Sequence, residues 1–209
     1  EAVARLSSSE LTGRLHLGAT EEVSAELVGN AVSRFDRVHP GVIIDIIVDR
    51  GLRLEELLDR GELDLALVQV SATDLRQDDT VLWQDDQVWI CAPDWTYGEG
   101  TVPLVTFGKD GFYRPLAEQI LSDAGIDYRA AFSGPSSASL LAAVEAGFGV
   151  ALMSSRSVSG RVITWPRGES LPDLPVVQQV ARSASGPRTE VVTALIADIT
   201  NELGEFTEG

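Results

Sequence analysis

Two adjacent carboxylates, Glu21 and Glu22, are the side chains of this sequence that are best placed to bind a ligand. They follow a predicted strand at residues 14–19 and open a predicted helix at residues 22–38. Open α/β sheets bind ligands at such places, where strands end and helices begin. If both acids face a cleft, they disfavour an anionic ligand and suit an amine or a hydrogen-bond donor. In the alternative, Thr20 caps the helix and the acids only complement its positive end.

A second candidate segment, residues 107–114, reads Phe-Gly-Lys-Asp-Gly-Phe-Tyr-Arg. It offers the Lys109 cation, the aromatic rings of Phe112 and Tyr113, and backbone N–H groups at the predicted start of a helix. This combination suits a polar ligand with a flat or apolar body. We expect this segment to face the acidic pair across a cleft.

Two further strand-to-helix junctions could contribute polar groups to the same site. Ser136 and Ser137 open a predicted helix, and capping of that helix is their simplest role. Arg50 and Gly51 follow a predicted strand. Their simplest interpretation is a turn in which the glycine takes a positive φ angle.

Motifs for enzyme chemistry are absent from the sequence. It contains neither Gly-x-Ser-x-Gly nor the phosphate-binding Gly-x-x-x-x-Gly-Lys-Ser/Thr pattern. His16 lies in a strand and His39 at a helix end, and no group of residues has metal-ligand spacing. The acid pairs at residues 55–56, 78–79 and 85–86 are predicted to be solvated surface, because charged residues are rarely buried. We therefore predict no enzyme activity, no metal and no cofactor.

The first set of candidates is positioned by a strand–helix–strand pattern within residues 34–68. The first helix stops at His39-Pro40-Gly41, because proline cannot continue it and glycine accepts the turn. Residues 42–48 are almost continuous valine and isoleucine, which is typical of a strand covered on both faces. A second helix ends at Gly61, and residues 63–68 form the next strand.

The remaining elements fall into two groups, which predict two lobes. Strands 81–83 and 87–92 are expected to pair within the first lobe, and residues 95–100 to cross into the second. The second lobe has predicted strands at 102–107, 130–133, 150–153 and 162–165, helices at 113–124 and 137–146, and a return crossover at 167–175. A strand at 176–181 and a final helix follow.

Composition favours a globular protein without its own nucleic-acid contact. The 209 residues are 44% hydrophobic and 23% charged, and the net charge of −16 would repel a phosphate backbone. The single Cys91 lies in an apolar run and is predicted to be a buried structural thiol. No apolar run approaches the roughly 20 residues that span a bilayer, and the start does not resemble a signal peptide. A cytoplasmic location without membrane contact is the expectation.

Four motifs resemble the effector-binding domain of LysR-type transcriptional regulators, and they occur in the family's order. They are Gly-Arg-Leu-His-Leu-Gly at 13–18, Phe-x-x-x-His-Pro-Gly-Val at 35–42, Gly-Glu-Leu-Asp-Leu-Ala-Leu at 61–67 and Ala-Gly-Phe-Gly-Val-Ala-Leu at 146–152. The resemblance covers about residues 11–203.

This resemblance implies an α/β fold of two Rossmann-like lobes joined by two crossovers, of the periplasmic-binding-protein type II kind. Lobe I would comprise residues 12–93 and 174–209, and lobe II residues 94–173. Residues 1–11 would be the tail of a linker helix. The family's N-terminal DNA-binding domain is not in this sequence, so DNA would be contacted only through that missing part.

The resemblance also implies a small-molecule effector between the lobes. Two departures prevent the effector's identity from being carried over: many members have small hydroxyl residues or amides at positions 21–22, and a proline often stands at 154–155. The positions that match the family's effector site are Thr20, Glu22, Val23, Gly51, Gln69, Phe112 and Ser136.

Family members form homo-oligomers, which implies a dimer here and a tetramer as an option for the full-length protein. The helices at 22–38 and 113–124 would pair across the dyad. The alternative is a periplasmic solute-binding protein, which has the same two-lobe architecture and whose mature chain lacks its signal peptide. The residues that precede Glu1 would distinguish the two, because one class has a winged helix-turn-helix there and the other a secretory signal.

Overall fold

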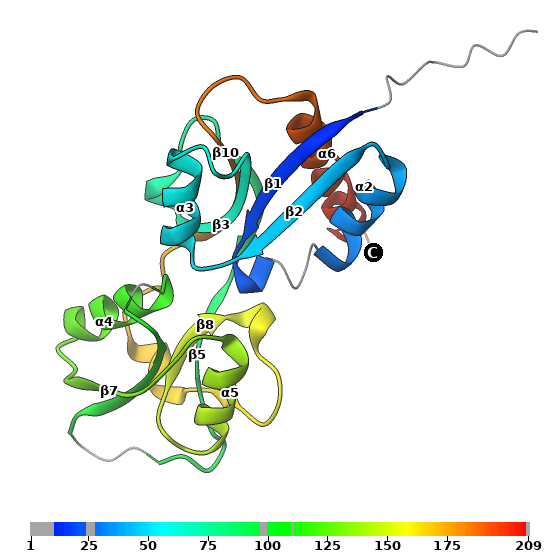
Figure 1. Cartoon of the computed structure of the whole chain (residues 1–209). Coiled ribbons are helices and arrows are strands. Elements are labelled where there is room, and N and C mark those ends of the chain that lie inside the picture. Colours follow the sequence, from blue (N-terminus) through cyan, green and yellow to red (C-terminus); the bar gives the residue numbers. More distant parts are fainter. Residues whose placement is uncertain (1–10, 24–27, 97–99, 110, 208–209) are drawn as a thin grey trace, which may run out of the picture.

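The computed structural model describes residues 11–23, 28–96, 100–109 and 111–207. In this part the chain forms two α/β lobes, one above the other in Figure 1, which two extended segments connect. This is the α/β architecture that the sequence predicts. The expected tail of a linker helix at residues 1–11 lies outside the described residues, apart from Leu11.

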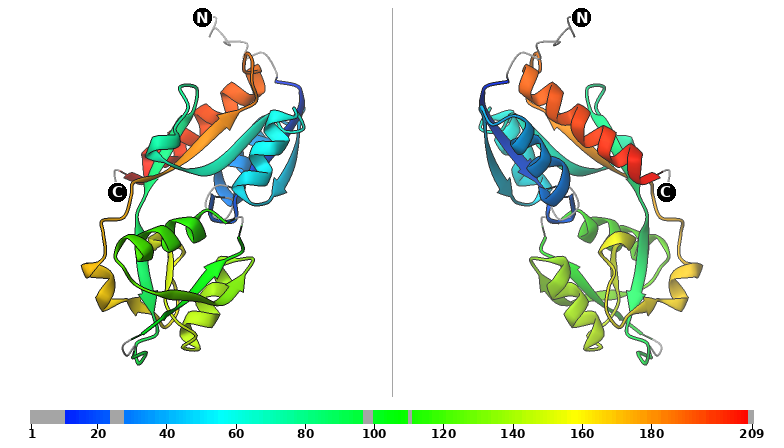
Figure 2. Two further views of the ribbon diagram at one scale, coloured as in Figure 1. Left: turned by 90° about the vertical axis from the view of Figure 1, so that its left-hand side faces the viewer. Right: turned by 90° about the vertical axis from the view of Figure 1, so that its right-hand side faces the viewer.

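The first lobe is built on a five-stranded sheet with the order β2-β1-β3-β10-β4. β1 is parallel to β2 and β3, whereas β10 is antiparallel to β3 and β4. One face packs against α2 and the long helix α6, and the other packs against α3 (Figure 2). The elements are β1 (Gly13–Ala19), η1 (Val28–Val32), α2 (Ser33–Val38), β2 (Val42–Val48), α3 (Gly51–Asp59), β3 (Leu65–Ser71), η2 (Ala72–Asp74), β4 (Thr80–Asp85), β10 (Val177–Ser183) and α6 (Glu190–Thr207).

The second lobe combines an antiparallel sheet β8-β5-β9 with a parallel pair β6-β7. A bridge between Leu104 and Val150 links the two sheets. One core cluster, which includes Trp89 and Leu140, joins both sheets to the helices. The elements are β5 (Gln87–Cys91), β6 (Val102–Phe107), α4 (Tyr113–Asp123), β7 (Tyr128–Gly134), α5 (Ser137–Glu145), β8 (Ala151–Ser154), η3 (Ser155–Ser157), β9 (Ile163–Thr164) and η4 (Pro166–Ser170).

The predicted pairing of strands 81–83 and 87–92 is wrong. β4 pairs with β10 in the first lobe, whereas β5 pairs with β8 and β9 in the second. Only Asp86 separates the two strands, and a hairpin needs a loop of at least two residues. The chain therefore leaves the first sheet at Asp86 rather than at residues 95–100.

The chain returns to the first lobe between η4 and β10. Leu171 and Leu174 still pack against the core of the second lobe, and Val177 already pairs within the first sheet. This return falls at the end of the predicted crossover at residues 167–175. Figure 2 shows the two connecting segments as extended stretches of chain between the lobes.

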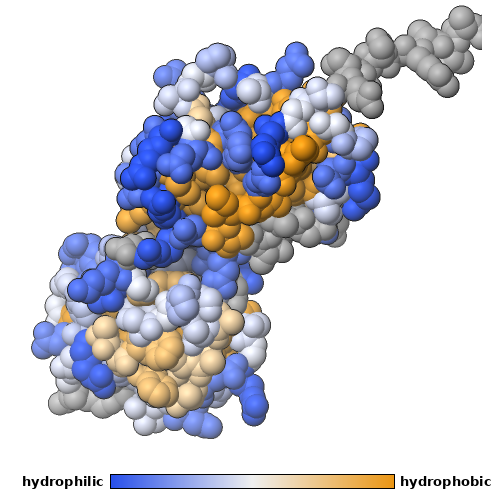
Figure 3. Space-filling view, viewed as in Figure 1, coloured by the Kyte–Doolittle hydropathy of each residue, from blue (hydrophilic) through white to orange (hydrophobic). Residues whose placement is uncertain are grey.

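The prediction that residues 42–48 are covered on both faces is also wrong. β2 is an edge strand, and α3 packs on β1 and β3 rather than on β2. Val42 is buried, but the side chains of Ile43 and Ile47 are 57% and 43% exposed. In Figure 3 apolar side chains accordingly gather on the surface of the upper lobe over β1 and β2.

Several predicted elements are confirmed to within one residue. Helices predicted at 113–124 and 137–146 are observed as α4 and α5, and Cys91 is buried as expected. The predicted helix at 22–38 is helical at 21–23 and from Val28 to Val38, with a π-helical turn before α2. Its residues 24–27 lie outside the described part.

Candidate functional site

A cavity of about 960 Å³ lies between the two lobes, and both lobes contribute to its wall. Its position follows from topology, because the carboxyl ends of β1 and β3 and those of β6 and β7 meet here with the starts of α3, α4 and α5. Apolar side chains such as Leu52 and Phe112 line much of it. The other lining residues include Thr20, Glu21, Glu22, Arg50, Gly51, Gln69, Lys109, Tyr113 and Ser136.

The acidic pair lines the cavity and also joins the two lobes. Glu21 Oε2 accepts a hydrogen bond from the backbone N–H of Ser137 at 3.0 Å, and Ser137 Oγ donates to Glu22 Oε1 at 3.4 Å. Ser137 is the first residue of α5, so lobe I places two carboxylates on a helix start of lobe II. Burial, assisted by the neighbouring charge of Glu21, raises the pKa of Glu22.

Thr20 does not cap a helix as the alternative interpretation supposed. Thr20 is 5% exposed, and its Oγ1 has no hydrogen-bond partner among the residues that the structure describes. Buried hydroxyl groups are usually hydrogen-bonded, and leaving one without a partner costs about 1–3 kcal/mol. Because Thr20 lines the cavity, its hydroxyl is a candidate contact for a ligand.

The opposite wall is aromatic. Phe107 stacks on Tyr113 with ring centroids 5.8 Å apart, and Phe112 meets Tyr113 edge-on at 5.4 Å. Gly111 allows this packing, since a Cβ at that position would lie 2.6 Å from Cβ of Phe107. Lys109 is an exposed cation at the rim. Of the segment predicted to face the acidic pair, residues 107–109 and 111–113 line the same cavity as that pair, and Asp110 lies outside the described residues.

A buried polar network joins the cavity to the junction of the lobes. Asp85, 2% exposed, accepts hydrogen bonds from Ser154 Oγ at 2.8 Å, Gln179 Nε2 at 3.1 Å and the Tyr113 hydroxyl at 3.3 Å. Gln69 in turn donates to the Tyr113 hydroxyl at 3.1 Å. Burial and the negative charges of Asp85 and Glu22 raise the pKa of Tyr113, so the phenol stays protonated. The network unites β3, β4 and β10 of lobe I with α4 and β8 of lobe II.

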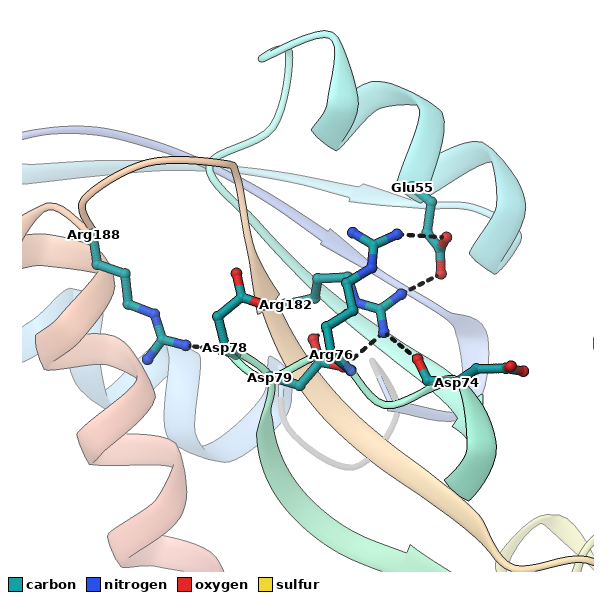
Figure 4. A network of polar contacts seen from close by, with 7 residues as sticks. All are labelled: Glu55, Asp74, Arg76, Asp78, Asp79, Arg182 and Arg188. Atoms are coloured by element: carbon teal, nitrogen blue, oxygen red, sulfur yellow. Dashed lines mark hydrogen bonds and ion pairs between the residues drawn. The ribbon is translucent and has the colours of Figure 1, made fainter.

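A second network lies in the lobe I part of the cavity wall and is drawn in Figure 4. Arg182, 3% exposed, donates to Asp79 through Nε and Nη2 at 2.8 and 2.7 Å and to Glu55 through Nη1 at 2.7 Å. Arg76 also reaches Glu55. Burial alone would raise the pKa of Asp79, but the hydrogen bonds and charges of Arg182 and Arg76 hold it below its ordinary value.

Most of the residues predicted for the site line this cavity, and two do not. Val23 is fully buried in the core of lobe I. Ser137 contributes only through its bonds to the acidic pair. Ser136 caps α5 in a reciprocal capping box, as its simplest interpretation predicted, and also lines the cavity. Gly51 opens α3 rather than a turn, and its φ is not positive.

The acid pairs at residues 55–56, 78–79 and 85–86 were predicted to be solvated, and this prediction is wrong for Asp79 and for Asp85. Asp79 and Asp85 are buried, since Arg182 supplies a counter-charge to the first and three neutral donors satisfy the second. Sequence reasoning overlooked both because these donors come from distant segments. The residues of β4 gave no signal of this burial, because exposed and half-buried positions do not alternate along it and Asp85 is its one buried residue.

Two classes of site receive no support from the part of the chain that the structure describes. Within it, no three His, Cys, Asp or Glu side chains are grouped closely enough to hold a metal ion. Nor does any described helix combine the length and apolar composition that crossing a membrane requires.

Comparisons with known proteins agree on one family. The family model described as LysR substrate binding domain matches residues 8–204. HTH-type transcriptional regulator PecT of Dickeya dadantii (strain 3937) is 28% identical over 176 residues, which are 84% of this chain and 55% of that protein. HTH-type transcriptional regulator DgdR of Burkholderia cepacia is 29% identical over 178 residues, 85% of this chain and 60% of that protein.

A solved structure shows the same fold. The effector binding domain of QuiR in complex with shikimate superposes with a TM-score of 0.72 at 16% identity and covers 93% of this chain and 99% of that one. This likeness confirms the expected two-lobed, periplasmic-binding-protein type II-like architecture. The chain spans only about 55–60% of the two regulators it matches in sequence.

Proposed function

Because this chain belongs to the LysR substrate binding domain family, we propose that it is the effector-sensing part of a LysR-type transcriptional regulator. A small molecule would bind in the cavity between the lobes and change their arrangement. The observation that carries this proposal is the cavity itself, which is largely apolar and contains, among a few polar groups, the Thr20 hydroxyl, which has no hydrogen-bond partner among the described residues. Such a composition is typical of small-molecule sites.

The effector site would use the lining residues that the sequence predicted. Phe112 and Tyr113 would contact an apolar or flat body, and Thr20 and Gln69 would offer hydrogen bonds. Arg50, Gly51, Lys109 and Ser136 would form the rim. Ser137 would act indirectly, by holding Glu21 and Glu22.

The regulatory output would require a DNA-binding domain supplied elsewhere in the full-length protein. PecT and DgdR are HTH-type transcriptional regulators, and the family is one of regulators rather than enzymes. With a net charge of −16, this part of the protein is unsuited to contact DNA itself. A regulator of this kind would work in the cytoplasm. These relatives favour the regulator over the periplasmic solute-binding alternative.

Ligand-dependent thermal unfolding tests the effector site. The panel contains amines, amino acids, aromatic acids and sugars, and a compound at 100 times its dissociation constant adds about 2.7 kcal/mol. For a domain of this size, that raises the unfolding midpoint by about 5–10 °C. A positive compound should lose its effect in Gly108→Leu, because Gly108 lines the cavity and has open space for a side chain. Gln77→Leu, exposed and outside the cavity, is the matched control.

Two results of this experiment would contradict the proposal. If a compound stabilises the wild type and G108L by the same amount, it binds elsewhere. If no compound in the panel changes the midpoint, a protein partner becomes the better candidate for the cavity.

We also propose a homodimer that pairs the region of α2 in one copy with α4 of the other, with a tetramer as an option for the full-length protein. The exposed aliphatic side chains of β2, which packs beside α2, support this surface. Cysteines introduced at Asp36 and Ser122, both exposed, should be joined between copies by a short bismaleimide. The double variant should give a covalent dimer and each single variant a monomer. Equal yields of covalent dimer from the double variant and from both single variants would contradict the pairing.

A further inference from the structure

The contact between Glu21 and α5 has the geometry of a bound anion. α5 has nine residues, and its start is organised by Ser136, whose Oγ accepts from the backbone N–H of Ser139 at 3.3 Å. The backbone N–H of Ser137 remains for a ligand from outside the helix. It is taken by Glu21, which lies 116 residues away in the sequence and in the other lobe.

Electrostatics explains why a carboxylate belongs at this position. A helix start presents free N–H groups and a positive partial charge, so it attracts anions. A tethered carboxylate occupies the position at a high effective concentration and cannot diffuse away. A free anion would have to displace Glu21 and would then meet the adjacent Glu22, which also contacts Ser137.

A second, independent observation concerns the polar group that a ligand can contact at this end of the cavity. The Thr20 hydroxyl is buried, lines the cavity and has no hydrogen-bond partner in the described part of the chain. A hydroxyl can donate or accept one hydrogen bond without requiring a charge on the ligand. The polar contact left open beside the acidic pair is therefore neutral.

We propose that Glu21 is a specificity-determining residue of this cavity: it fills the anion position of α5 from within and restricts the effector to neutral or cationic molecules that hydrogen-bond with Thr20. This inference rests on the proposed effector site. A molecule with a hydroxyl, amide or ammonium group and a flat or apolar body fits the remaining wall of Phe107, Phe112 and Tyr113.

Chemical rescue by acetate tests the anion position without any knowledge of the effector. In Glu21→Ala the N–H of Ser137 loses its acceptor, and acetate should replace the missing carboxylate. We expect acetate to raise the unfolding midpoint of E21A by about 2–5 °C relative to chloride at equal ionic strength. The wild type and Glu22→Ala should not respond, because Glu21 still occupies the position. Glu21→Gln, which keeps an acceptor oxygen without the charge, should respond weakly or not at all.

Each outcome decides the question. Equal responses of the wild type, E21A and E22A to acetate, or no response of E21A beyond that of E22A, would overturn the inference. Should E21A not fold, Glu21→Ser shortens the side chain less severely and takes its place in the same titration. Restoration of E21S stability by acetate alone would support the inference.

Matched ligands then test the effect on specificity. Benzoate, benzamide and benzylamine share one ring and differ in the polar group. Benzoate should raise the unfolding midpoint of E21A more than it raises that of the wild type. Benzamide and benzylamine should raise the midpoint of E21A no more than that of the wild type. A wild type that binds benzoate as well as E21A does would overturn the assignment. If acetate rescues E21A but no compound in either ligand panel changes the unfolding midpoint, the effector site is contradicted and the anion position is still supported.

Discussion

Replacing Asp85 by alanine removes the acceptor that three buried donors share. Ser154, Gln179 and Tyr113 would each lose a hydrogen bond, at 2.8, 3.1 and 3.3 Å respectively. A buried donor without a partner costs about 1–3 kcal/mol. Loss of the carboxylate also relieves the cost of burying its charge, so we expect the low end of the sum, about 3 kcal/mol. For a domain of this size that lowers the unfolding midpoint by about 6–12 °C.

Asp86 provides the matched control, because it is the next residue, carries the same charge and is exposed. Asp86→Ala should change stability by no more than about 0.5 kcal/mol. Thermal and urea unfolding followed by tryptophan fluorescence measure both variants, since both lobes contain tryptophan. A midpoint of D85A within about 2 °C of that of D86A would refute the claim that the network holds the lobes together.

Tyr113→Phe extends the test to the cavity, because the Tyr113 hydroxyl connects Gln69 to Asp85. If Asp85 and Tyr113 act as one network, the double variant should be less destabilised than the sum of the single variants by about 0.5–3 kcal/mol. Strict additivity would mean that the cavity wall and the junction are energetically independent.

Three further predictions concern single side chains. Arg182→Ala leaves Asp79 buried without its partner and should cost about 3–5 kcal/mol in urea unfolding, with a smaller loss in Arg182→Lys. Burial raises the pKa of the Glu22 carboxyl in the folded state above its unfolded value of about 4.3. The protonated carboxyl therefore contributes to the free energy of unfolding below the unfolded pKa, and this contribution is lost as the pH rises through the folded pKa. Glu22→Gln should therefore gain urea resistance over the wild type at pH 8 but not at pH 4. Gly149→Ala should prevent folding, as judged by circular dichroism, because a Cβ there would overlap the carbonyl oxygen of Pro103 and φ is +154°.

The fold was predictable where local patterns carry the information. The alternation of apolar runs with helical periodicity located the strands and helices on either side of the cavity, and Ser136 marked the start of α5. The position of β2 at a sheet edge was not predictable, because its valines and isoleucines have the composition of a central strand. Edge position depends on sheet order, which is set by pairing with distant strands. The separation of β4 from β5 was overlooked for a related reason, since two apolar runs one residue apart look alike in either sheet.

The site was predictable to the extent that ligand sites follow strand-to-helix junctions. Thr20, Gln69 and Phe112 line the cavity as the resemblance implied. Asp85 was taken for a surface residue because charged side chains are rarely buried, and its donors Ser154 and Gln179 stand 69 and 94 residues away. Only the folded chain brings them together. Val23, which the resemblance implied for the effector site, is buried in the core of lobe I and does not line the cavity, because matching a family position does not say which way a side chain points.

The lobes are joined by polar contacts made largely by residues that also line the cavity. Gln69 and Tyr113 connect the wall to Asp85 at the junction, and Glu21 reaches from one lobe to α5 of the other. A ligand that engages any of these groups must either add to these contacts or compete with them. Its binding free energy then differs between arrangements of the lobes, which is the requirement for a sensor. The same reciprocity means that weakening an interlobe contact outside the cavity wall, as in D85A, should change ligand affinity even though the ligand does not touch the altered residue.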